Sequence, residues 1–154
     1  MTQRTFPQLG GFSLALPSTW HEHTVKQQSG VAAFVFSDSP NRPFQAFLEL
    51  IGPLPVGTDG AAELTELIRQ EAAGSGIRKH DASTPSQFSG ISGGGADSYT
   101  ASSAWQQDGT VGLSMFLMLQ NGRTKEYVRL RLALVSGGTE EVLVPDILGS
   151  LAFV

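Results

Sequence analysis

The sequence contains no cysteine. This absence excludes disulfide bonds, thiol catalysis, cysteine-ligated zinc and iron–sulfur clusters. No apolar run reaches about 18 residues, so we expect no membrane-spanning helix and no insertion into a membrane. The segment from Met1 to Phe6 lacks the apolar stretch of a secretory signal, which predicts a cytoplasmic protein.

Charged residues are also sparse, at 16% of the 154 positions, against about 25% in typical soluble domains. Ten Lys and Arg face fourteen Asp and Glu, which gives a net charge of −4. We therefore expect no nucleic-acid partner. Hydrophobic residues make up 40% of the sequence, enough for one core, and the length fits a single globular domain over residues 1–154.

Alternating or continuous apolar segments predict a series of β-strands separated by Gly, Pro, Asn and Asp residues. A long amphipathic helix is expected between Asp59 and Gly74, and a short one after Thr139. The order of strands, helix, strands and helix predicts an α+β fold with a central antiparallel sheet of about six or seven strands flanked by helices. The expected strand segments are residues 12–16, 20–28, 31–36, 44–51, 77–80, 87–91, 96–105, 111–120, 123–135 and 151–154.

Two short motifs resemble the PsbP/Mog-like fold family. One is the segment GFSLALPSTW from Gly11 to Trp20, in which an alternating strand ends at a proline and a tryptophan follows. The other is ILGSLAF from Ile147 to Phe153, which is similar to the closing helix and Ser-Leu segment of the family. The resemblance implies a central antiparallel sheet flanked by helices.

The same resemblance implies a binding or assembly role without catalytic residues, as in LpqN-like proteins and Eag-type secretion chaperones. The matched motif residues are structural, so the resemblance assigns no functional site. The chain departs from several family members because it lacks a signal peptide and a lipidated cysteine, which argues against a lumenal or lipoprotein role.

Patterns for catalysis and cofactor binding are weak. Residues 90–94 match G-x-S-x-G, but this chemistry requires a strand-to-helix turn at the serine and a histidine later in the chain. All three histidines precede Ser92, so a glycine-rich bend between strands is the favoured interpretation. The common nucleotide-binding glycine loops are absent. We expect a non-enzymatic protein without a cofactor.

The two histidines of His21-x-His23 would share one face of a strand, a spacing that can hold a metal. A third ligand would have to come from His80, Asp81 or Glu49. Two solvated histidines are the favoured interpretation, and no metal is expected. A small-molecule or metal-binding protein using the His21 and His23 region remains an alternative function.

The pair Asn121-Gly122 between two long apolar segments predicts a two-residue hairpin turn, which would place Gln120 opposite Arg123 and Phe116 opposite Tyr127. One face of this hairpin would pack into the core. The opposite face would carry Ser114, Phe116, Met118, Arg123, Lys125, Tyr127, Arg129 and Arg131.

That second face gathers basic and aromatic side chains in an acidic protein. Arginine donates forked hydrogen bonds to carboxylates, and aromatic and methionine side chains add adaptable apolar contact. We therefore predict docking of a partner protein or an acidic peptide on it. An ordinary solvated face, or one partly covered by a helix, is the alternative, as is a homo-oligomeric structural subunit that uses this face for self-association. The predicted partner-binding residues are Phe116, Met118, Lys125, Tyr127, Arg129 and Arg131.

Overall fold

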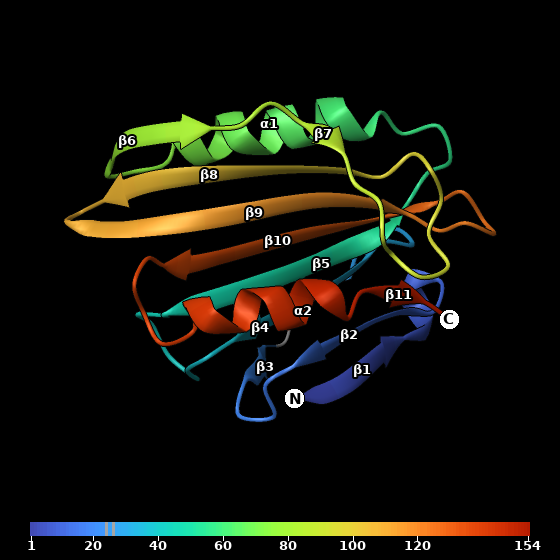
Figure 1. The fold of residues 1–154 in the computed structure, drawn as a ribbon, viewed down its shortest axis with the longest axis horizontal. Helices are drawn as coiled ribbons and strands as arrows, with labels where there is room; N and C mark the ends of the chain where they lie inside the picture. Colours follow the sequence, from blue (N-terminus) through green and yellow to red (C-terminus); the bar gives the residue numbers. More distant parts are fainter. Residues whose placement is uncertain (24, 26) are drawn as a thin grey trace.

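The computed structural model describes residues 1–23, 25 and 27–154. Two sheets and two α-helices form the fold (Figure 1). The α-helices are α1, Gly60–Ala72, and α2, Val144–Gly149, and the short 3-10 helices are η1, Pro7–Leu9, and η2, Glu141–Leu143. The strands are β1, Thr2–Phe6; β2, Phe12–Leu16; β3, His21–His23; β4, Ala32–Ser37; β5, Ala46–Leu54; β6, Ile77–Ala82; β7, Ser86–Gln87; β8, Tyr99–Gln107; β9, Thr110–Gln120; β10, Tyr127–Val135; and β11, Ala152–Phe153.

The main sheet has eight strands in the order β3-β4-β5-β10-β9-β8-β6, with β7 paired to β8, and the paired strands are antiparallel. A small sheet has the order β1-β2-β11. The predicted α+β class with an antiparallel sheet and flanking helices is confirmed. The main sheet has more strands than the expected six or seven. In the small sheet, β1 was not predicted because its segment, TQRTF, is largely polar.

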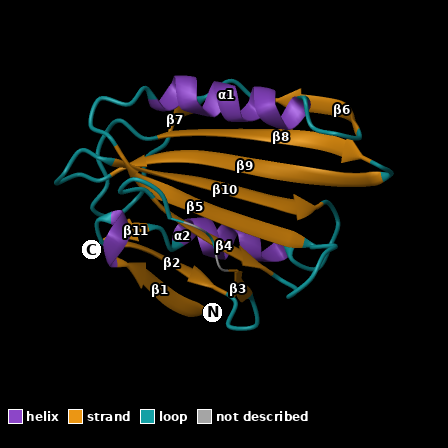
Figure 2. Cartoon of the chain, turned by 180° about the vertical axis from the view of Figure 1, so that it is seen from behind, coloured by secondary structure: helices purple, strands orange, loops and turns teal. Residues whose placement is uncertain are grey.

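The two faces of the main sheet are covered differently. On one face, which we call the helix face, α1 contacts β8 and β9 and packs Leu64 against Phe116 and Met118. Figure 2 shows α1 along the margin of the sheet near β8 and β6. On the other face, β2 of the small sheet contributes Phe12 and Leu14 to the larger core, and α2 contacts β2.

The first α-helix begins and ends where its sequence predicts. The side chain of Asp59 accepts a hydrogen bond from the backbone N–H of Ala62 at 3.1 Å, which caps the first turn. The helix ends at Ala72, two residues before Gly74. Its apolar stripe continues from Leu64 along the buried side, and the last turn carries Glu71 into the same interface.

Other predicted elements differ in extent. Within the expected strand over residues 20–28, the described residues form β3, and positions 24 and 26 lie outside the described residues. The expected strand over 87–91 is limited to β7. The expected strand over residues 44–51 was predicted to end before Gly52 and Pro53, and this end is wrong, because β5 continues to Leu54. Its pairing with β10 shifts between Tyr127 and Arg129, and such an irregularity accommodates a proline that cannot donate to the ladder.

Within the described part of the chain, no helix combines the length and the apolar character needed to cross a bilayer.

Candidate functional site

The hairpin of β9 and β10 has a different register from the predicted one. Tyr127 pairs with Gln120, Arg129 with Met118 and Arg131 with Phe116, so the prediction of a two-residue Asn121-Gly122 turn is wrong. The turn spans residues 122–125 instead, closed by a hydrogen bond from Asn121 N to the Glu126 carbonyl at 2.8 Å. The predicted sets of side chains still share the same faces of the hairpin, because the observed register differs from the predicted one by an even number of residues.

The physical reason for the longer turn lies in Asn121. Its side-chain oxygen accepts from the backbone N–H of Arg123 at 2.9 Å, and its side-chain amide donates to the Gly10 carbonyl at 3.1 Å. The N–H of Gly122 also donates to the Gly93 carbonyl at 2.9 Å. These contacts with distant loops fix a conformation that a free Asn-Gly turn does not adopt.

Three of the six predicted partner-binding side chains are not accessible. Phe116, Met118 and Tyr127 are buried beneath α1, where they pack with Leu64 and Ala101. The expectation that they form an open aromatic surface is therefore wrong. A helix covers this part of the sheet because the stripe of α1 and the apolar side chains of β9 bury one another.

The hydroxyl of Tyr127 donates to Asp97 Oδ2 at 3.2 Å, and burial followed by the charge of Asp97 raises the pKa of this phenol above 10.0. Lys125 lies in the turn before β10 with a φ of 64° and is exposed. It does not line the pocket described below.

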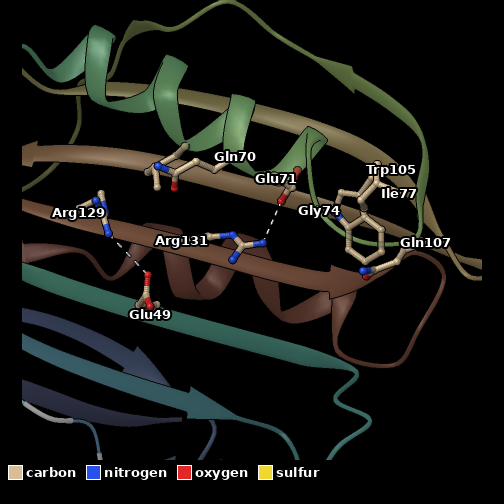
Figure 3. A pocket seen from close by; sticks show the side chains of 10 residues that line it. Glu49, Gln70, Glu71, Gly74, Ile77, Trp105, Gln107, Arg129 and Arg131 are labelled. Atoms are coloured by element: carbon tan, nitrogen blue, oxygen red, sulfur yellow. Dashed lines mark hydrogen bonds and ion pairs between the residues drawn. The ribbon is translucent and has the colours of Figure 1, made fainter.

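The remaining two predicted residues, Arg129 and Arg131, lie at the border of α1, where the helix face becomes open (Figure 3). Arg131 Nη2 donates to Glu71 Oε2 at 3.1 Å, and its guanidinium lies 5.9 Å from the ring centroid of Phe116. Arg129 makes looser ion pairs, at 4.0 Å to Glu49 and 3.7 Å to Glu63.

Glu71 is the centre of a buried polar network. Its side chain is only 6% exposed. Its Oε1 lies 2.8 Å from His80 Nε2 and accepts from the Ser103 hydroxyl, and its Oε2 accepts from the Ser114 hydroxyl at 2.6 Å as well as from Arg131. We call Glu71, His80, Ser103, Ser114 and Arg131 the Glu71 network.

The Glu71 network keeps this carboxylate ionised. Burial alone raises the pKa of Glu71, but hydrogen bonds from Ser103, Ser114 and His80 and the charge of Arg131 outweigh it, so that the pKa lies below the ordinary 4.5. Trp105 extends the network, since its indole N–H donates to the Ser114 hydroxyl at 2.9 Å.

A pocket of about 470 Å³ opens between the end of α1 and strands β5, β8 and β10. We call it the arginine pocket. Figure 3 shows Arg129 and Arg131 on its floor, with Glu49 on one side and Gln70 and Glu71 above them. Its lining residues are Glu49, Leu67, Gln70, Glu71, Gly74, Ile77, Trp105, Gln107, Arg129 and Arg131.

Sequence reasoning missed the acidic half of this pocket. Glu71 follows Leu64, Leu67 and Ile68 at helical spacing, so a carboxylate on the apolar stripe of α1 was the available signal. The sequence analysis named Glu49 only as a possible third metal ligand beside His21 and His23. Its role here follows from the pairing of β5 with β10, which places Glu49 opposite Arg131.

The histidines do not meet. His21 and His23 lie on β3, at one edge of the main sheet, whereas His80 lies on β6 at the other edge and is bonded to Glu71. His23 Nε2 lies 2.5 Å from the Ser37 hydroxyl oxygen. Among the residues that the structure describes, no group of three or more His, Cys, Asp or Glu side chains is arranged to hold a metal.

The G-x-S-x-G segment lies beside β11. Ser92 forms an isolated bridge with Ala152, and its carbonyl accepts from the N–H of Phe153 at 2.8 Å. Gly93 has a φ of 71°, and a Cβ there would lie 2.3 Å from the Phe153 carbonyl oxygen. Ser92 therefore lies in a loop that contacts β11, not at a strand-to-helix turn.

Comparison with solved structures identifies the fold. The Ran-binding protein Mog1p of Saccharomyces cerevisiae matches with a TM-score of 0.60 and 7% identity, over 99% of this chain and 94% of that protein. A mutant of protein Mog1 matches with a TM-score of 0.58 and 9% identity, over 100% of this chain and 97% of that one. A Bacteroides thetaiotaomicron protein matches 97% of this chain over 47% of its own length, with a TM-score of 0.50 and 15% identity.

The chain thus has the Mog1/PsbP-like fold, which confirms the resemblance seen in its two sequence motifs. No protein-family model matches the sequence, and neither does any curated protein sequence.

Proposed function

We propose that this chain is a non-enzymatic binding domain that docks a segment of a partner protein at the arginine pocket. The observation that carries the proposal is the unequal use of the two arginines. Arg131 is held by the buried Glu71, whereas Arg129 has only ion pairs of 3.7 and 4.0 Å. Arg129 is the side chain that can exchange its present contacts for a partner at small cost.

An acidic side chain on the partner fits the donors of this pocket. Arg131 is already held by Glu71, and its Nε is buried. Arg129 lies on the same face of β10, two residues away, and its side chain is 21% exposed. A partner carboxylate could accept hydrogen bonds from Arg129, because a guanidinium group donates in a forked geometry that matches a carboxylate.

The chemistry of the Glu71 network supports binding over catalysis. Ser103 and Ser114 donate their hydroxyl protons to Glu71, and neither hydroxyl is bonded to His80 in the described structure. An activated serine needs a base that accepts its proton at the reaction pH. Glu71 has a lowered pKa and is poorly suited to be that base near neutral pH.

The fold adds support at a general level. Mog1p, which shares it over nearly the whole chain, is described as a Ran-binding protein. We carry over only the class of function, a domain that binds another protein. At 7% identity the likeness does not extend to the identity of the partner.

The test is a quantitative pull-down from the source lysate with three baits: wild type, Arg129→Gln and Arg78→Gln. Arg78 is an exposed arginine on β6, outside the pocket lining, so its variant controls for the loss of one positive charge. We expect a protein that is enriched on wild type and on Arg78→Gln but reduced about tenfold on Arg129→Gln, a loss of about 1.4 kcal/mol.

Equal profiles on all three baits would contradict the proposal. Sedimentation of the same proteins tests the homo-oligomer alternative. An oligomer that dissociates in Arg129→Gln but not in Arg78→Gln would assign the pocket to self-association instead.

A further inference from the structure

The face of the main sheet opposite α1 carries an apolar groove of about 630 Å³. The small sheet and α2 cover the part of this face that contributes to the larger core. They leave the outer part open, where Ser102 and Ala104 of β8 are exposed. The apolar lining side chains of the groove include Leu113, Met115, Leu134, Val144 and Pro145.

The floor of the groove is one row of residues across four strands. Leu134 pairs with Leu113, Leu113 with Ala104, and Ala104 with Asp81. Neighbouring strands lie about 4.8 Å apart, so this row spans about 14 Å, the length of about four extended residues. The turn from η2 into α2, with Val144 and Pro145, forms a wall.

The charges of the groove have one sign. Asp81 and Glu141 are the charged side chains that line it, and no Lys or Arg of the described chain joins them. Asp81 ends the apolar row at the edge strand β6, and Glu141 lies on η2. Two exposed valines flank the lining, Val142 beside Glu141 and Val111 two positions before Leu113 on β9, at 76% and 52% exposure.

We propose that this groove is a second docking site, for a short partner segment that combines apolar side chains with Lys or Arg. The apolar side chains would cover Leu113, Met115 and Leu134, and the exposed valines extend this surface beyond the groove. The basic side chain would pair with Asp81 or Glu141. A long, open row of four strands suits a peptide segment, and acidic groups at its rim select for positive charge.

The groove is separate from the arginine pocket, and its acidic side chains favour a basic partner segment, whereas the arginine pocket favours an acidic one. Ala104 points to the groove, whereas its neighbours Ser103 and Trp105 point to the helix face, where they belong to or contact the Glu71 network. One protein could therefore hold two partner segments on opposite faces of the same sheet.

The experiment uses the full chain and a displayed library of random peptides of about twelve residues. Peptides enriched on wild type are measured on three variants: Ala104→Arg, which fills the groove and adds a positive charge opposite Asp81; Asp81→Asn/Glu141→Gln, which keeps the shape; and Thr100→Arg. Thr100 lies on the same strand and the same face as Ala104 but outside the groove lining, so it is the matched control.

We expect enriched peptides with two or more apolar residues and a Lys or Arg. Their affinity should fall about tenfold or more on Ala104→Arg and severalfold on Asp81→Asn/Glu141→Gln, and should stay unchanged on Thr100→Arg. The proposal is overturned if no peptide is enriched, if the enriched peptides are acidic, or if they bind Ala104→Arg as well as wild type. Added salt should weaken binding, because Asp81 is exposed and Glu141 is half-buried, so that both charges are screened by solvent ions.

Discussion

Arg131 Nη2 and Glu71 Oε2 lie 3.1 Å apart, and this ion pair joins the middle of β10 to the last turn of α1. Arg129, two residues earlier on the same face, has no comparable anchor. The two arginines that the sequence analysis grouped together thus have different roles. Arg131 holds the helix to the sheet, whereas Arg129 makes only ion pairs of 3.7 and 4.0 Å.

Replacing Glu71 by Ala should destabilise the fold by about 3 kcal/mol. The change removes the acceptor of four side chains and leaves Arg131 and two serine hydroxyls without their partner. Urea denaturation measures the loss. Glu66→Ala on the same helix is the control, because the Glu66–Arg69 pair is exposed and should contribute little. Equal losses in both variants would show that the Glu71 network is not stabilising.

Acid should weaken the protein through Glu71. Its pKa in the folded protein is below the ordinary 4.5, so the stability that it contributes is complete at higher pH and is lost as the pH falls through the folded pKa. We expect the difference in stability between wild type and Glu71→Gln to be constant from about pH 7 to 5 and to shrink below about pH 4.5. Urea midpoints measured across this range test it, and a difference that does not change with pH would contradict the lowered pKa.

Arg131→Ala should cost more stability than Arg129→Ala. The first change takes a charged hydrogen bond from a buried carboxylate, which costs about 1.5–3 kcal/mol. The second removes two long ion pairs and should cost less than about 1 kcal/mol. Thermal unfolding of the two variants under identical conditions decides the order. The reverse order would refute the division of roles between the two arginines.

Gly112→Val should displace Trp105. A Cβ at Gly112 would lie 2.1 Å from Trp105 Cζ2, so the ring lies over this glycine on the neighbouring strand. We expect a loss of about 1–3 kcal/mol from overpacking and a red-shifted tryptophan emission. Gly149→Ala is the control, since a Cβ there has no heavy atom within 4 Å. An unchanged emission spectrum in Gly112→Val would contradict the position of the ring.

The fold could be predicted from local patterns because most of its elements carry their own signals. The stripe from Ala61 to Ala72 and the cap at Asp59 specify α1, and the alternation in β9 and β10 specifies which side chains share a face. Since alternation has a period of two, the grouping of Arg129 with Phe116 was correct even though their register was wrong.

The site itself required information that no local segment contains. The turn at Asn121 depends on Gly10 and Gly93, both far away in the sequence. The burial of Phe116 depends on α1 packing on its side of the sheet, and the sequence does not say which face the helix covers. Glu71 and Arg131 are 60 positions apart, and only the packed structure brings them together.

The small sheet places a constraint on how the protein is made. Its central strand, β2, pairs with β1 on one side and with β11 on the other, where Phe12 meets Phe153. Until the ribosome has added β11, one edge of β2 has no partner, and Phe12 lacks its contact with Phe153. The small sheet therefore closes late in folding, and until β11 has been made the nascent chain carries an unpaired strand edge, a feature that favours aggregation.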